Sequence, residues 1–144
     1  MLTRYIALFF LIVLLSSATG CANRATATLT AGADLGKVKN FYIVQTPEDK
    51  ETHGLIKTNL EKRGFTTTTG PEMKSPYNSD AVITYTDKWM WDITMYMLEL
   101  TINLRNPTNN YPMAVGNSMH ASLTRKSPEE MVDEVLTNIF NSKR

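Results

Sequence analysis

The chain has 144 residues, with 15 lysines and arginines against 14 aspartates and glutamates and a formal net charge of +1. This near-neutral balance lacks the basic footprint expected of a protein that binds nucleic acid or an anionic membrane surface. Removing residues 1–20 leaves 124 residues, enough for one domain with its own hydrophobic core and too few for two.

Residues 1–20 have the organisation of a secretory signal peptide. Arg4 supplies a positive charge, residues 5–15 form an apolar run, and small residues follow directly before Cys21. The apolar run is shorter than the roughly 20 residues that a membrane-spanning helix needs. The pattern therefore favours a cleaved signal peptide over the alternative, an uncleaved N-terminal anchor.

Cys21 is the only cysteine, so a secreted chain must pair it with another chain, leave it reactive or modify it. Residues 18–21, ATGC, resemble the lipobox of bacterial lipoproteins, although Ala18 stands where leucine is usual and Thr19 where alanine or serine is commoner. The resemblance implies a covalent lipid on Cys21, with palmitate-type acyl chains that together hold the protein at the bilayer. Ala22, in place of aspartate, implies sorting to the outer membrane under the enterobacterial rule.

Residues 21–36 are predicted to form a lipidated flexible tether. The segment is rich in alanine and threonine and has no stable apolar period. Fully extended, it could reach roughly 50 Å from the membrane. The alternative is an early strand at 26–30, which the threonines favour.

The remaining residues, 37–144, are predicted to form a single periplasmic domain. Thr46 and Pro47 are typical of a helix start, Gly64 of a helix end, and Ser127 with Glu130 of a capping box. In chain order we expect a strand at 37–45, a helix up to Gly64, a strand at 65–69, a loop at 70–79, strands at 81–91, 96–104 and 113–124, and a helix after Ser127.

The stretch at 81–104 contains both tryptophans of the chain. Apolar residues mostly occupy odd positions from 81 to 91, with Asp87 as an exception, and even positions from 96 to 104. A change of parity without a helical period predicts two strands joined by a turn at 92–94. Gly116, in the following strand, predicts a bulge or a close approach of another backbone or side chain.

The expected element order is β-α-β-β-β-β-α, which predicts an α+β fold: one mixed, mostly antiparallel sheet of about five strands with two helices on one face. Together with the lipobox, the segments 91–107 and 121–140 resemble small uncharacterised bacterial α/β outer-membrane lipoproteins. The order is also loosely similar to the lipopolysaccharide-assembly lipoprotein and to TolB N-terminal-like domains. The resemblance implies an envelope location and a fold, and it implies no chemistry.

The sequence offers little support for catalysis. It has no phosphate-binding glycine loop and no Gly-x-Ser-x-Gly motif. Asp87, Asp92 and Glu99 could pair as acid and base across the hairpin, but acids on strand ends and open faces are usually solvated. We therefore expect no enzyme activity and no cofactor beyond the lipid on Cys21.

Trp89, Trp91, Met95 and Met97 are the candidate partner-binding residues. We expect both tryptophans on the core side of their strand and both methionines on the more open face of the next strand. The alternative is a soft-metal site for Cu(I), with Met95, Met97 and His120 as weak ligand candidates. Methionine also fills gaps in cores and at adaptable contact surfaces.

The sequence thus predicts a lipoprotein anchored in the outer membrane and facing the periplasm. Its partners would be the lipid bilayer, through acylated Cys21, and an envelope protein. Its role would be that of an accessory, assembly or protein-binding module. Periplasmic Cu(I) binding is the alternative function.

Overall fold

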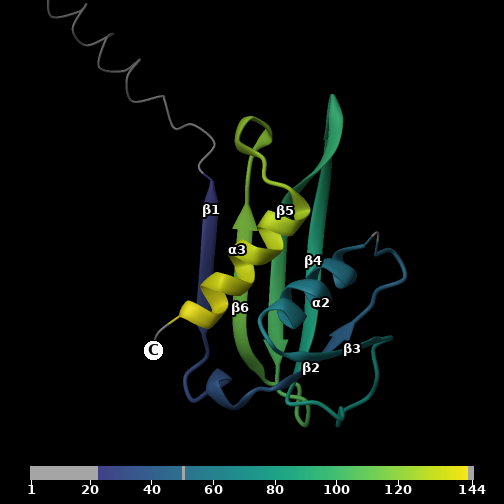
Figure 1. The fold of residues 1–144 in the computed structure, drawn as a ribbon, viewed down its shortest axis with the longest axis vertical. Coiled ribbons are helices and arrows are strands. Elements are labelled where there is room, and N and C mark those ends of the chain that lie inside the picture. Colours follow the sequence, from purple (N-terminus) through teal and green to yellow (C-terminus); the bar gives the residue numbers. More distant parts are fainter. Residues whose placement is uncertain (1–22, 50, 143–144) are drawn as a thin grey trace, which may run out of the picture.

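A computed structural model describes residues 23–49 and 51–142 of the chain. It contains one mixed sheet of six strands in the order β1-β6-β5-β4-β2-β3, with two helices packed on one face (Figure 1). The elements are β1 (Arg24–Leu29), the 3-10 helix η1 (Leu35–Lys37), β2 (Asn40–Val44), α2 (Thr52–Lys62), β3 (Thr66–Gly70), β4 (Ala81–Asp92), β5 (Thr94–Arg105), β6 (Pro112–Met119), the 3-10 helix η2 (Ser122–Thr124) and α3 (Pro128–Asn141).

The sheet confirms the predicted α+β class. β1, β6, β5 and β4 pair antiparallel, whereas β2 runs parallel to both of its neighbours, β3 and β4. The helix α2 connects the parallel strands β2 and β3, as a β-α-β unit requires. None of the described helices is both long and apolar enough to cross a membrane.

The prediction of a tether at 21–36 is wrong for residues Arg24–Leu29. The Ala/Thr segment forms edge strand β1, which pairs with β6 from Arg24 opposite Met119 to Leu29 opposite Ala114. Ala27 and Leu29 pack against the core, so alternate positions of this segment have an apolar face to bury. The weaker alternative, an early strand, is therefore confirmed, and it makes the sixth strand. Residues 21 and 22 lie outside the described part of the chain.

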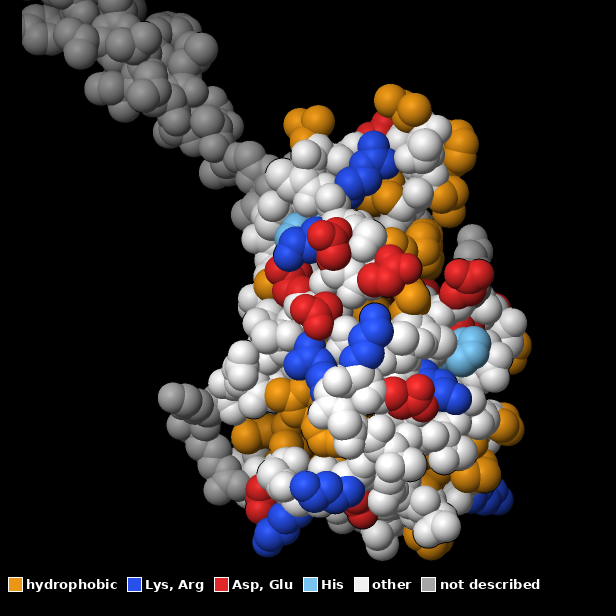
Figure 2. Space-filling model, in the orientation of Figure 1, with side chains coloured by type: hydrophobic (Ala, Val, Ile, Leu, Met, Phe, Trp, Pro, Cys, Tyr) orange, Lys and Arg blue, Asp and Glu red, His pale blue; other side chains and the backbone are white. Residues whose placement is uncertain are grey.

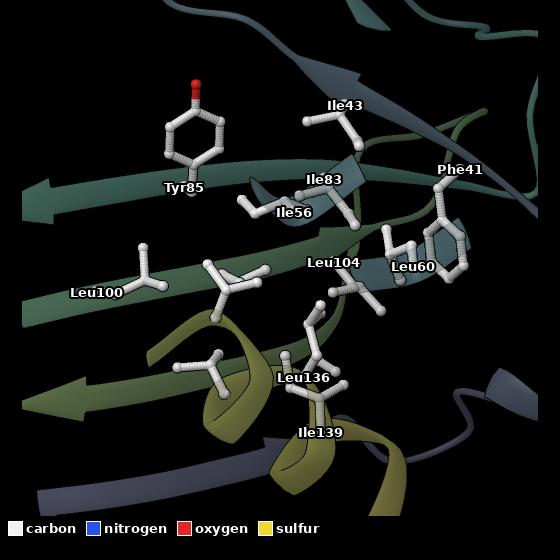
Figure 3. Close-up of a cluster of buried hydrophobic side chains, with 14 of the residues drawn as sticks. Phe41, Ile43, Ile56, Leu60, Ile83, Tyr85, Leu100, Leu104, Leu136 and Ile139 are labelled. Atoms are coloured by element: carbon white, nitrogen blue, oxygen red, sulfur yellow. The ribbon is translucent and has the colours of Figure 1, made fainter. Parts of the chain in front are cut away.

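The core lies between the sheet and the two helices, and Figure 3 shows its side chains meeting from both layers. Gly116 of β6 is a close-approach position, because a Cβ there would stand 2.8 Å from the Cγ1 atoms of Val135 and Ile139 in α3. The predicted capping box of α3 is confirmed: the Ser127 hydroxyl accepts from the Glu130 amide, and the Glu130 carboxylate accepts from the Ser127 amide.

The start of α2 differs from the prediction. The helix begins at Thr52 rather than after Thr46. Its N-cap residue is Glu51, and the carboxylate of Asp49, two residues earlier, accepts from the amides of Glu51, Thr52 and His53. An aspartate that takes three amide donors satisfies more of the helix start than a threonine hydroxyl can. The predicted end is confirmed, since the last helical residue is Lys62 and Gly64 adopts a positive φ of 89°. β6 also ends earlier than predicted, at Met119, and η2 follows it.

Candidate contact surface at the hairpin tip

The β4–β5 hairpin is the longest pair of strands in the sheet, twelve residues each, and a single residue, Ile93, connects them. The pairing is regular from Val82 to Lys88, where it shifts: Lys88 stands opposite Glu99, whereas Trp89 stands opposite Met97. Leu98 is thus the extra residue of a β-bulge. A bulge reverses which side of the strand the following residues face.

Beyond the bulge, the hairpin tip exposes large apolar side chains. The exposed fractions are 47% for Met90, 70% for Trp91, 85% for Ile93 and 47% for Met95. Trp91 stands opposite Met95 on one side of the hairpin, and Met90 stands opposite Tyr96 on the other. Apolar side chains therefore project from both sides of the tip, and Figure 2 shows hydrophobic atoms gathered at this end of the molecule.

The segment after β6 packs beside the tip and adds to the apolar surface. The hydroxyl of Ser122 donates to the carboxylate of Asp92. The guanidinium of Arg125 donates to the Thr94 hydroxyl at 2.8 Å and lies 5.1 Å from the Tyr96 ring. Between these contacts Leu123 is 99% exposed. We call the exposed set Met90, Trp91, Ile93, Met95 and Leu123 the tip surface.

The beginning of the described chain lies at the same end. The hydroxyl of Thr124 donates to the side-chain oxygen of Asn23 at 2.6 Å. Arg24, the first residue of β1, contacts Glu99 beside the bulge, with 2.9 Å between Nη2 and Oε1. The tip surface and the start of β1 are therefore neighbours.

The four predicted partner-binding residues do not lie together. Trp91 and Met95 belong to the tip surface. Trp91 lies on the same side of β4 as Trp89, as predicted, but it does not reach the core, because the hairpin extends past the helices that cover the sheet. Trp89 is partly buried against the core, as predicted, and its Nε1 donates to Asp87 at 2.9 Å. Met97 is fully buried in the core, which corrects its placement on the open face; the bulge at Leu98 turns it toward the helices.

The weak metal candidates are also separated. Met95 is half exposed at the tip, whereas Met97 is fully buried. His120 is buried and its Nε2 lies 2.8 Å from Glu134 Oε2, although its buried Nδ1 has no hydrogen-bond partner among the described residues. Within the described ranges, no three His, Cys, Asp or Glu side chains gather as a metal site.

The three acids considered for catalysis are held apart by structural contacts. Asp87 accepts from the Thr52 hydroxyl at 2.6 Å on the side of the helices. Glu99 lies on the opposite face of the sheet, where Lys88 and Arg24 contact it. Hydrogen bonds, first of all from Lys88, lower the pKa of Glu99. Asp92 is bound by Ser122 at the tip.

Two further carboxylates, which sequence reasoning did not single out, hold the helices to the sheet. Burial by itself raises the pKa of Asp49, but hydrogen bonds from Tyr85, from helix amides and from His53 lower it to about 2. Burial likewise raises the pKa of Glu134, and hydrogen bonds from Lys126, Ser118 and His120 lower it to about 2. Both groups are consequently ionised acceptors at neutral pH, not proton donors.

The face of the sheet away from the helices is mostly polar across β1, β6, β5 and the middle of β4, whereas a second apolar cluster, Tyr42, Val44, Tyr77 and Val82, covers it at β2 and the start of β4. Its cross-strand rows are Arg24 with Met119, Glu99 and Lys88; Thr26 with Asn117, Thr101 and Thr86; and Thr28 with Val115, Asn103 and Thr84. Polar residues on one face and apolar residues on the other are usual for an antiparallel sheet with one solvated face. The tip surface is therefore the feature that ordinary sheet packing does not account for.

Sequence reasoning missed Ile93 and Leu123. Both had a signal, because each is a large apolar residue inside a short polar turn segment, where neither strand nor helix packing requires one.

No protein-family model matches the chain, and no curated protein matches it. Solved structures share its fold at low identity. The PelC dodecamer from Paraburkholderia phytofirmans matches with a TM-score of 0.59 and 13% identity over 80% of this chain and 97% of that one. A PDZ domain protein from Parabacteroides distasonis matches with a TM-score of 0.52 and 11% identity over 83% of this chain. This chain spans only 36% of the PDZ domain protein. TolB from Acinetobacter baumannii matches with a TM-score of 0.48 and 14% identity over 82% of this chain and 31% of TolB. The similarities to PelC and to the PDZ domain protein support the fold and leave the family open.

Proposed function

We propose that this protein is a membrane-anchored envelope lipoprotein that works by contact, as an accessory or protein-binding module without catalytic activity. Acylation of Cys21 would hold it at the outer membrane, facing the periplasm. One observation carries the proposal: of the eight exposed large apolar side chains among the described residues, five form the tip surface. Exposed apolar patches mark interaction sites, and tryptophan is enriched among residues that dominate binding energy.

A non-catalytic role is supported by how the acidic groups are used. Asp49 and Glu134 are ionised acceptors within the fold, and Asp87 bridges α2 and Trp89. A general acid or base near neutral pH instead needs a pKa close to the working pH.

The proposed protein partner would meet surface that the membrane leaves free. The polar sheet face and the exposed edge of β1 are both available for it. PelC, which shares the fold, is a dodecamer, so a second copy of this chain is one candidate partner.

The test combines mass spectrometry with crosslinking. The purified native protein should give an N-terminal peptide that starts at Cys21 and carries the mass of attached acyl chains. Crosslinking in intact cells should then join the protein to a discrete envelope protein or to a second copy, and Val115→Asp, at an exposed position of the polar sheet face, should reduce this product. Tyr111→Asp is the matched control, because Tyr111 is exposed in the loop between β5 and β6 and not on the sheet face.

Two results would overturn the proposal. An intact Met1 or a free Cys21 thiol in the native protein would remove the anchor. A reproducible turnover activity that Asp87→Ala abolishes, with the fold retained, would make the protein an enzyme.

A further inference from the structure

We infer that the tip surface rests on the lipid bilayer, so that the domain lies with its hairpin tip in the membrane interface. The inference rests on the proposed acylation of Cys21, and it adds a second, non-covalent membrane contact.

The first step is the length of chain between the lipid site and the fold. Asn23 is already fixed to Thr124, at the tip end. Consecutive Cα atoms are 3.8 Å apart, so the Cα of Cys21 lies within about 8 Å of the Cα of Asn23. By contrast, the twelve residues of β5 extend roughly 40 Å away from the tip. A lipid on Cys21 therefore enters the bilayer beside the tip surface and far from the opposite end.

The second step is the chemistry of the tip surface. Trp91 is an amphipathic aromatic residue of the kind enriched at membrane interfaces, and Ile93 and Leu123 supply apolar side chains that are almost fully exposed. Arg125, held beside Tyr96 and Thr94, places a cation behind them, at the level where lipid phosphates would lie. This arrangement matches an interfacial anchor.

The third step is the shape of the tip. Met90 projects from one side of the hairpin and Trp91 with Met95 from the other. A protein groove would have to enclose both sides, whereas a fluid bilayer surrounds a projecting finger without a matched shape. The acyl chains proposed on Cys21 would suffice for stable anchoring, so the tip would fix the orientation of the domain rather than supply the anchor.

The test uses the tryptophans as depth probes in the full native protein. The protein is reconstituted in phosphatidylethanolamine–phosphatidylglycerol vesicles with or without bromine on the acyl chains, and bromine quenches the emission of a nearby indole. In the Trp89→Phe variant only Trp91 emits. In the matched Trp91→Phe variant only Trp89 emits, which is partly buried against the core. We expect quenching to be severalfold stronger in the Trp89→Phe variant.

The Trp89→Phe variant loses the hydrogen bond from Trp89 to Asp87 and could fail to fold, so a second measurement of Trp91 is included. If Trp89→Phe does not fold, the emission of Trp91 is obtained as the difference between wild type and Trp91→Phe. Equal and weak quenching of both tryptophans would overturn the inference. So would a Trp91 emission that changes only when membrane proteins are added to the vesicles, because that outcome assigns the tip surface to a protein partner.

The N-terminal mass of the same preparation separates this inference from the proposed function. Acylated Cys21 with unquenched Trp91 leaves the anchor standing and overturns the bilayer contact. Unmodified Cys21 with strongly quenched Trp91 removes the anchor and supports the bilayer contact on its own.

Discussion

Truncation of the two methionines of β5 should destabilise the protein to very different extents. Met97 is fully buried in the core, whereas Met95 is 47% exposed at the tip. Met97→Ala leaves a cavity among packed side chains, and such changes cost about 2–5 kcal/mol of unfolding free energy. Met95→Ala removes a side chain that is already half in water, so its cost should be about 1 kcal/mol or less.

Thermal and urea unfolding of the purified protein measure this difference. For a domain of this size, 2–5 kcal/mol corresponds to a fall in Tm of roughly 6–20 °C. Met95→Ala is the matched control, since it removes the same atoms two residues away on the same side of the strand. An equal loss of unfolding free energy in the two variants would refute the placement of Met97 in the core and the placement of the bulge at Leu98.

The same variants decide between a packing role and Cu(I) binding. A metal that binds only the folded protein raises its stability by about 2.7 kcal/mol at a hundredfold excess over the dissociation constant. We expect Cu(I) to leave the unfolding midpoint of the wild type unchanged, because Met95 and Met97 occupy different environments. A Cu(I)-dependent rise that disappears in Met95→Ala/Met97→Ala would establish the metal site instead.

Two further predictions concern the contacts between helices and sheet. The pKa of Asp49 is about 2 in the fold against an ordinary 3.8, so its stabilisation, about 2 kcal/mol, is present above pH 3.8 and is lost as the pH falls toward 2. Asp49→Asn should therefore have a lower unfolding free energy than wild type at neutral pH, by about that amount. Urea unfolding at a series of pH values should show the difference between the two proteins shrinking as the pH falls toward 2. A difference that does not change with pH would contradict the role of the ionised Asp49 carboxylate. Gly116→Ala should cost about 1–3 kcal/mol, because the new Cβ meets Val135 and Ile139 at 2.8 Å. Gly54→Ala, in open space on α2, is its control and should stabilise or be neutral in the same thermal scan.

Much of the fold could be predicted because local signals agreed with packing. The alternation along β4 and β5 predicts strands, the Ser127–Glu130 capping box predicts a helix start, and Gly64 predicts a helix end. Each of these signals depends only on residues close together in the sequence. β1 could not be predicted with the same certainty, because its strand character comes from pairing with β6, some ninety residues later, and its Ala/Thr composition suits a tether equally well.

The start of α2 was misplaced for a related reason. Thr46 and Pro47 form a plausible local start, but Asp49 also accepts a 2.6 Å hydrogen bond from Tyr85 in β4. A tertiary contact therefore selects the later cap, and no pattern within the helix sequence contains it.

The candidate site was predicted in part. The hairpin and its apolar content were visible, but side-chain direction was extrapolated by strict alternation. One inserted residue, Leu98, breaks that alternation and carries Met97 into the core. The exposure of Trp91 depends on where the helices stop covering the sheet, which is a property of the assembled layers.

Strand β1 changes what anchoring at Cys21 would mean. A fifteen-residue tether would let the domain act roughly 50 Å from the membrane and in any orientation. With the Asn23 side chain bound to Thr124, the link would be only a couple of residues long, and the fold would restrict the orientation of the domain. The strands would then run outward from the membrane, with the β5–β6 loop toward the far end and the polar sheet face clear of the bilayer. A partner protein would meet this face or the edge of β1 from the side, and its reach from the membrane would be limited to the roughly 40 Å length of β5.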